Sequence, residues 1–275
     1  MPMDPRRAGI LREMGLAPLW CLRGGKEEAS PLARPVAADE APTSMPHGPE
    51  PAVSMPPPPL RQTPPPRPSP LAIVAAPVPV SAEVAGMDWG SLQQAVVDCK
   101  ACNLCQKRRQ SVFGVGDRQA DWLFVGEGPG ADEDEQGEPF VGQAGKLLDA
   151  MLAAIHLRRG EDVYIANTVK CRPPGNRTPE GEEITACFPF LARQIELLRP
   201  RLIVALGRPA AQTLLNADVK IADARGRVHD YRGIPVIVTY HPAYLLRNLA
   251  DKSKSWEDLC FARRTMAGLV VKSER

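Results

Sequence analysis

The amino-acid sequence predicts an α/β protein, with three layers arranged α/β/α around a mostly parallel four-stranded sheet. Two observations carry this prediction. Short apolar segments of strand length recur along the chain, and segments with helical periodicity separate them. Strands that alternate with helices form parallel sheets with helices on both faces. The expected strands are residues 122–126, 162–167, 202–206 and 235–239.

The expected helices carry apolar residues along one face. In the clearest of them the helical spacing is kept by Ala144, Leu147, Leu148, Met151, Leu152 and Ile155. The other expected helices are residues 180–198, 208–216 and 254–268. Right-handed crossovers through such helices place the carboxyl ends of all the parallel strands at one edge of the sheet.

The first third of the chain differs in composition from the rest. Of 30 prolines, 20 precede residue 87, and runs such as 56–59 favour extended polyproline conformations that build no core. We therefore expect a short N-terminal segment at 1–29, a disordered proline-rich linker at 30–86, and one folded domain at 87–275.

The N-terminal segment holds one candidate element, at residues 5–23. Its pattern is that of a short amphipathic helix, serving either as a fraying terminus or as a docking segment for a protein partner. The apolar run within it is too short and too broken for a signal peptide or a membrane span. We expect no membrane association and a monomer.

The charge balance points to no single class of partner. Lys and Arg number 34 against 32 Asp and Glu, a net charge of +2, so there is no global basic excess. Local basic clusters do occur, and they would suit phosphate contacts if they converged on one face. These clusters are Lys170, Arg172 and Arg177; Arg225, Arg227 and Arg232; and Arg247, Lys252 and Lys254.

Polar side chains follow the expected strands at the edge where their carboxyl ends meet. Glu127 follows the first strand within a glycine-rich turn, Asn167 ends the second, and His241 follows the fourth. Ligands bind at this edge in α/β sheets. The loop at 126–145 adds close-approach glycines, a run of carboxylates and a lone aromatic, Phe140. The sequence therefore predicts an active site here.

Seven cysteines form a second candidate site. Their odd number and spacing argue against a disulfide framework and for a reducing intracellular, cytoplasmic setting. Cys99 and Cys102 make one pair and Cys171 and Cys187 another, and four thiolates suit either tetrahedral zinc or a [4Fe–4S] cluster. Cys105 leaves the ligand set open, because Cys102 and Cys105 are also spaced as a pair. Cys21 and Cys260 are expected to be ordinary thiols.

Four ordered motifs resemble the signature segments of the family 4 uracil-DNA glycosylases. They read CKACNLCQKR, GEGPGADEDEQGEPFVGQAG, YIANTVKCRPPGNRTP and HPAYLLRN, and the similarity covers about 88–270. The resemblance implies the uracil-glycosylase α/β/α fold, a structural [4Fe–4S] cluster, no redox or catalytic metal, and excision of uracil from DNA as the first step of base excision repair. Ala131 departs from the pattern, since relatives often carry an acid there.

The resemblance also assigns residues. The cluster ligands would be Cys99, Cys102, Cys171 and Cys187, which excludes Cys105. In the substrate pocket, the implied set is Gly126, Glu127, Gly128, Glu133, Phe140, Asn167 and His241. Phe140 would stack on the base, Asn167 would read its polar edge and His241 would sit by O2. Glu127 would act at the sugar–base bond. Glu133 would border the base near C5.

These residue types suit the chemistry. The target base must leave the duplex to be reached, and an aromatic ring stacks on any flipped base. The carboxamide of Asn167 presents both a donor and an acceptor, which match uracil O4 and N3–H. His241 can donate a hydrogen bond to O2 as negative charge develops there.

Two rival functions remain at this stage. One is a non-catalytic binder of uracil-containing or damaged DNA with the same fold, which a uracil-release assay separates from an enzyme. The other is a nucleotide-binding metabolic enzyme. It is disfavoured because the glycines at 126, 128 and 130 do not form G-x-G-x-x-G and residues 142–146 lack the P-loop spacing.

Overall fold

The computed structural model describes residues 82–273. These residues belong to one compact unit of the chain. The expectations for residues 1–29 and for almost all of the linker, including the helix at 5–23 and Cys21, lie outside the described residues. The packed part already includes helix α2 (Ala82–Ala85), whose Val84 is buried, a few residues before the expected start at 87.

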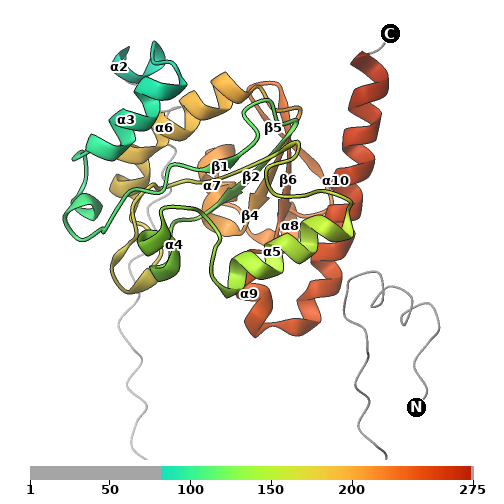
Figure 1. The fold of residues 1–275 in the computed structure, drawn as a ribbon. Coiled ribbons are helices and arrows are strands. Elements are labelled where there is room, and N and C mark those ends of the chain that lie inside the picture. The colour runs from blue at the N-terminus through green and yellow to red at the C-terminus, as the bar shows by residue number, and fades with distance from the viewer. Residues whose placement is uncertain (1–81, 274–275) are drawn as a thin grey trace, which may run out of the picture. The chain divides into compact units, whose positions relative to one another are not determined.

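The described strands form one sheet of six strands in the order β1-β3-β2-β4-β6-β5 (Figure 1). The four expected strands are confirmed as its parallel centre: β2 (Trp122–Gly126), β3 (Val163–Asn167), β4 (Leu202–Leu206) and β6 (Ile234–Thr239). Two short antiparallel strands were missed, β1 (Val115–Gly116) and β5 (Val228–Tyr231), which pair with β3 and β6 at the edges. The sheet therefore has six strands rather than four.

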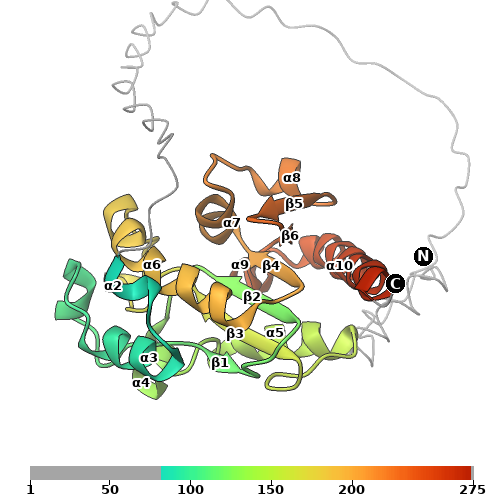
Figure 2. The same ribbon diagram turned by 90° about the horizontal axis from the view of Figure 1, so that it is seen from above.

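Helices cover both faces of the sheet, which confirms the three layers (Figure 2). On one face, Leu123 and Val125 of β2 pack with α6 (Gly181–Leu198), α7 (Arg208–Leu215) and α8 (Ile221–Ala224). On the other, Trp122 and Phe124 pack with α5 (Gln143–Ala154), α9 (Pro242–Arg247) and α10 (Lys252–Ser273). Because alternate side chains of a strand point to opposite faces, the wholly apolar β2 serves both layers.

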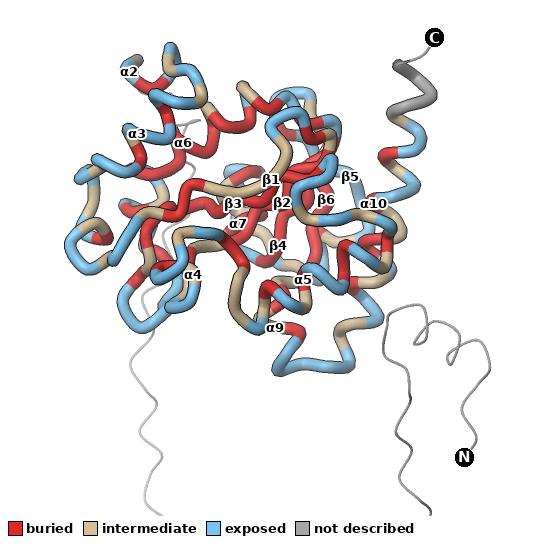
Figure 3. Tube along the Cα trace, viewed as in Figure 1, coloured by how far each residue is buried: buried red, intermediate tan, exposed pale blue. Residues whose placement is uncertain are grey.

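A third apolar cluster lies at one end of the described domain. It contains α3 (Trp89–Asp98), the 3₁₀ turn η1 (Asn103–Gln106) and part of α6, with Leu92, Val96 and Phe190 buried in it (Figure 3). Cys171 and Cys187 are buried in the same cluster. The N-terminal helices thus pack against helix α6 beside these cysteines.

The remaining short elements lie in the loops that follow β2 and β3 and between α9 and α10. They are α4 (Ala131–Gln136), η2 (Pro174–Asn176) and η3 (Leu249–Asp251). Helix α4 was not expected within the acidic loop. Gly130 is its N-cap, and Asp132, Glu133 and Asp134 lie in its first turn, where carboxylates interact favourably with the helix dipole.

Candidate active site

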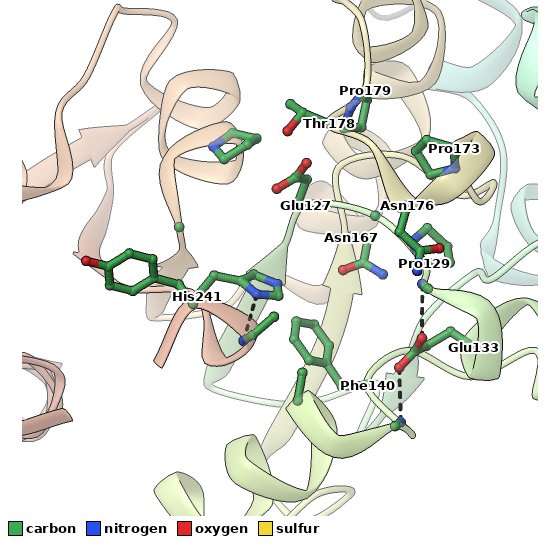
Figure 4. A pocket seen from close by; sticks show the side chains of 18 of the residues that line it. Glu127, Pro129, Glu133, Phe140, Asn167, Pro173, Asn176, Thr178, Pro179 and His241 are labelled. Atoms are coloured by element: carbon green, nitrogen blue, oxygen red, sulfur yellow. Dashed lines mark hydrogen bonds between the residues drawn. The ribbon is translucent and has the colours of Figure 1, made fainter. Parts of the chain in front are cut away.

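A cavity of about 730 Å³ lies at the carboxyl ends of β2, β3, β4 and β6 (Figure 4). Six of the seven pocket residues expected from the sequence line it: Glu127, Gly128, Glu133, Phe140, Asn167 and His241. Gly126 lies behind them. A side chain at Gly126 would collide with Asn167 and come within 2.5 Å of the Phe140 ring. The glycine is therefore needed so that these two side chains can pack against the strand end.

Asn167 ends β3, opposite Gly126 in the parallel register. The side chain is buried, with 2% of the residue exposed, and its Oδ1 has no hydrogen-bond partner among the described residues. A buried acceptor without a partner costs free energy. Its position beside the cavity therefore favours a ligand that brings a donor. Its main-chain carbonyl accepts a hydrogen bond from Lys170 Nζ at 2.9 Å.

Phe140 forms the wall of the cavity next to His241, with the ring centroids 5.4 Å apart and the planes inclined by 31°. Only 5% of the residue is exposed. Its backbone has φ of 57°, in the left-handed region. A side chain at Gly145 would collide with the Phe140 carbonyl group, so α5 approaches this loop closely only because residue 145 is a glycine.

His241 follows β6 and caps helix α9. Its Nδ1 accepts a hydrogen bond from the backbone N–H of Ala243 at 3.2 Å. The proton of the neutral ring is therefore on Nε2, which can donate. Burial, helped by the positive charge of Arg247, lowers the pKa of His241 to about 4. The half-buried imidazole is neutral near pH 7.

Glu127 is the carboxylate next to the strand end, and its side chain lies near Thr178 across the cavity (Figure 4). Burial raises the pKa of Glu127, and a hydrogen bond with the Thr178 side chain opposes this increase. The Glu127 carbonyl accepts the backbone N–H of Val169 at 3.2 Å, which ties the turn after β2 to the segment after β3. Gly128 keeps this turn close, since a side chain there would lie 2.8 Å from Val169.

Glu133 lines the cavity, but its carboxylate binds the protein's own backbone. One oxygen accepts from Gly130 N–H at 3.0 Å, and the other accepts from Val141 and Gly142 N–H at 3.0 and 3.1 Å. These bonds close the loop that carries Phe140. The Glu133 carboxylate therefore stabilises this loop. Its expected position near C5 of the base stays a prediction.

Several cavity residues were not identified from the sequence. Thr178 and Asn176 come from the loop after β3. Arg177 holds this loop against α6 through a bidentate ion pair with Glu183, at 2.7 and 2.8 Å. This pairing holds the pKa of Glu183 below its usual range. The signal for this loop was its RPPGNRTP composition, whose prolines and glycine favour a rigid turn.

The basic clusters expected at the surface are only partly there. Lys170 is 1% exposed and points inward, so it is not a surface cation. Arg177 pairs with Glu183, and Arg225 pairs with Asp258 at 3.1 Å. Arg247 lines the cavity mouth and is exposed. Sequence spacing could not reveal the ion pair of Arg225 or the burial of Lys170, because Asp258 and Gln194 lie 33 and 24 residues further along the chain.

Exposed apolar side chains stand beside Arg247. Leu246 is 41% exposed and Leu249 64% exposed, among the few large apolar residues of the described chain that are so open to solvent. The adjacent Tyr240 and Tyr244 rings are stacked, with centroids 5.2 Å apart, and both line the cavity. Neither the exposed leucines nor the two tyrosines of the cavity wall were predicted from the sequence.

Five cysteines gather at the third apolar cluster. Cys99, Cys102, Cys105, Cys171 and Cys187 line one small void, together with Val96 and Phe190. Arg108 Nη1 donates to Cys171 Sγ at 2.9 Å, and the Lys170 backbone N–H donates to Cys187 Sγ at 3.2 Å. The two expected pairs do meet, and Cys105 meets them as well. Among residues 82–273, no three His, Cys, Asp or Glu side chains are grouped to hold a single metal ion.

Comparison with known proteins gives the family. The profile of the uracil DNA glycosylase superfamily matches residues 113–260. A type-4 uracil-DNA glycosylase of Archaeoglobus fulgidus is 49% identical over 159 residues, which are 55% of this chain and 79% of that protein. Type-4 enzymes of Pyrobaculum aerophilum and Thermotoga maritima are 44% and 48% identical, over 63% and 58% of this chain and 92% and 84% of those proteins. The chain belongs to the uracil-DNA glycosylase superfamily, in its type-4 branch, which confirms the resemblance seen in the motifs.

Among the helices that the structure describes, none is long and apolar enough to cross a membrane.

Proposed function

We propose that this protein excises uracil from DNA by hydrolysing the bond between the base and deoxyribose, leaving an abasic site. The observation that carries the proposal is the unpartnered, buried Oδ1 of Asn167 inside a cavity whose other walls are Phe140 and His241. Membership of the superfamily supports the same reaction, since the similar type-4 proteins are named uracil-DNA glycosylases.

Base recognition rests on Asn167 and Phe140. Uracil would stack on the Phe140 ring, while the unpartnered Oδ1 accepts N3–H and the amide nitrogen donates to O4. Cytosine has no N3–H and carries an amino group in place of O4. It would leave both amide atoms mispaired, at a cost of about 1–3 kcal/mol each.

Bond cleavage rests on His241 and Glu127. Nε2–H of the neutral imidazole can donate to uracil O2 as the departing base becomes an anion. Glu127 can stabilise the cationic sugar or orient the attacking water. Burial raises the pKa of Glu127, and the hydrogen bond with Thr178 opposes that increase and favours the anion.

The cavity mouth suits DNA. Leu246 and Leu249 are exposed apolar side chains beside Arg247, and apolar wedges of this kind unstack a duplex so that a base can flip. Arg247 and Lys252 would contact phosphates and make binding depend on salt.

For the cysteine site we propose a structural [4Fe–4S] cluster held by Cys99, Cys102, Cys171 and Cys187. All four of these cysteines line one small void, and four thiolates suit such a cluster, which the motif resemblance also implies. The N–H groups that reach Cys171 and Cys187 suit thiolate ligands. A reducing intracellular setting would preserve such a site.

The test is release of uracil from matched oligonucleotides containing uracil, cytosine or thymine at one position. We expect release from the uracil strand alone. Asn167→Asp, which replaces the amide donor with an acceptor, should weaken binding of the flipped uracil by on the order of tenfold or more. Uracil-specific binding without release would instead indicate the non-catalytic DNA binder.

A further inference from the structure

The backbone of Phe140 is held in a conformation that it would not adopt unaided. Its φ of 57° lies in the left-handed region, which costs free energy for any side chain other than that of glycine. Such residues persist when the surrounding structure holds them. The contacts that hold Phe140 therefore also determine where its ring lies in the cavity.

Arg159 supplies those contacts on one side. Its Nη1 donates to the Pro139 carbonyl at 2.8 Å and its Nη2 donates to the Phe140 carbonyl at 2.7 Å, so one guanidinium spans two successive peptide groups. The guanidinium is itself fixed by Asp149 of α5, at 3.0 Å from Nε and 2.9 Å from Nη2. Its side chain is 22% exposed.

Glu133 holds the same stretch through its amides, and one of the two peptide groups that it binds is the one whose Phe140 carbonyl accepts from Arg159. It accepts the N–H groups of Val141 and Gly142, which directly follow Phe140. Four consecutive residues, 139–142, are thus bound by one cation at their carbonyls and one anion at their amides. Glu133 lies in the acidic loop that the sequence motifs include, whereas Arg159 lies in the turn before β3, outside every motif segment.

We propose that Arg159 is a positioning residue for base recognition, acting solely through the Phe140 platform. This inference rests on the proposed function of Phe140 as the surface on which uracil stacks. Arg159 orients the platform and has no contact with the base, so its loss disturbs binding of the flipped base and leaves the departure of the uracil anion to His241. A lysine cannot replace it fully, because a single ammonium lacks the planar fork that spans both carbonyls.

The experiment measures single-turnover uracil release over a range of enzyme concentrations. Arg159→Ala should raise the concentration for half-maximal rate by on the order of tenfold, as for the loss of a charge-assisted hydrogen bond, with the maximal rate near that of the parent. Arg159→Lys should give a half-maximal concentration between that of the parent and that of Arg159→Ala. Arg158→Ala is the matched control, since the adjacent Arg158 side chain is 77% exposed and reaches only Glu161 among its described ion pairs. An Arg159→Ala enzyme that behaves like the control overturns the inference.

Two further measurements separate positioning from general loss of structure. In a Phe140→Ala background, Arg159→Ala should cause no further increase in the half-maximal enzyme concentration. Neither Arg159→Ala nor Phe140→Ala should change the affinity for DNA with a tetrahydrofuran abasic site, because that site offers no base to stack. The inference would be overturned if Arg159→Ala raised the half-maximal concentration as much in the Phe140→Ala protein as in the parent, or if it weakened binding of abasic DNA. Failure of the proposed function looks different, because the parent protein itself would then release no uracil. Uracil release by Phe140→Ala at the rate and half-maximal concentration of the parent would instead remove Phe140 from its stacking role and overturn this inference alone.

Discussion

At the scale of single residues, the cavity holds two titratable groups whose pKa values move in opposite directions. Burial lowers the pKa of His241 to about 4, while burial raises the pKa of Glu127. Burial disfavours the charged form of both groups. The histidine is therefore a neutral donor through Nε2 over the whole neutral range, and the carboxylate loses its charge earlier than an exposed one as the pH falls.

His241→Ala should slow the chemical step by on the order of 10²–10³, the usual cost of removing one donor aimed at developing charge. DNA affinity should stay near that of the parent, because the base is held by Phe140 and Asn167. Single-turnover rates at saturating enzyme, beside a separate affinity measurement, test this. An unmodified rate would remove His241 from its proposed role.

Protonation of Glu127 should cause the loss of rate on the acid side of the pH–rate profile. Its anion is the working form, so the rate falls as the pH drops through the raised pKa, and Glu127→Gln should abolish this dependence along with most of the activity. His241→Ala should keep this loss of rate on the acid side, since His241 titrates only near pH 4. Single-turnover rates between pH 5 and 8 decide which residue titrates.

The position of Lys170 could not be predicted from the sequence. Lys170 belongs to a basic run in the sequence, yet in the structure its Nζ turns inward to the Asn167 carbonyl and to Gln194 Oε1 at 2.6 Å. Gln194 lies 24 residues further along, on α6. A partner at that distance leaves no local pattern, so the burial of Lys170 could not be predicted.

At the scale of elements, the long periodic helices and the apolar central strands were predictable, whereas the short elements were not. β1 has two residues and β5 alternates without a strongly apolar face, so neither has the apolar run that signals a strand. Both exist because an edge of the parallel sheet offers unpaired backbone groups to them. Helix α4 likewise lacks an apolar pattern, because it lies within an acidic, glycine-rich segment.

The cysteine site links two elements far apart in sequence, the turn at η1 and helix α6. Purified protein should contain iron and show broad visible absorbance. Cys171→Ala should remove the iron and lower the melting temperature, because cluster ligation joins these elements. Cys105→Ala is the matched control from the same void and should keep the iron. Stoichiometric zinc without iron would contradict the cluster, and iron loss in Cys105→Ala would contradict the ligand set.

At the scale of the whole molecule, every residue proposed to bind the base, cleave the bond or hold the cluster lies between Cys99 and His241, within the described part of the chain. Deleting residues 1–81 should therefore leave uracil release from short oligonucleotides largely unchanged. The truncation keeps α2, since Val84 is buried against the cluster that contains the cysteines. Circular dichroism and the release assay check the result. Loss of both fold and activity would show that the domain begins earlier, and the oligomeric state, expected to be a monomer, can be measured on the same protein.

The sequence by itself determined the layers, the four central strands and the edge at which the site lies, because these follow from local periodicity and from the right-handed crossover. It also named the residues around the cavity through their motifs. Only the tertiary structure decided which charges are engaged. Glu133 is bound to backbone amides, Arg159 holds the Phe140 loop, and Cys105 joins the other cysteines. Each of these depends on distances between segments that are remote in sequence, and chain packing alone sets such distances.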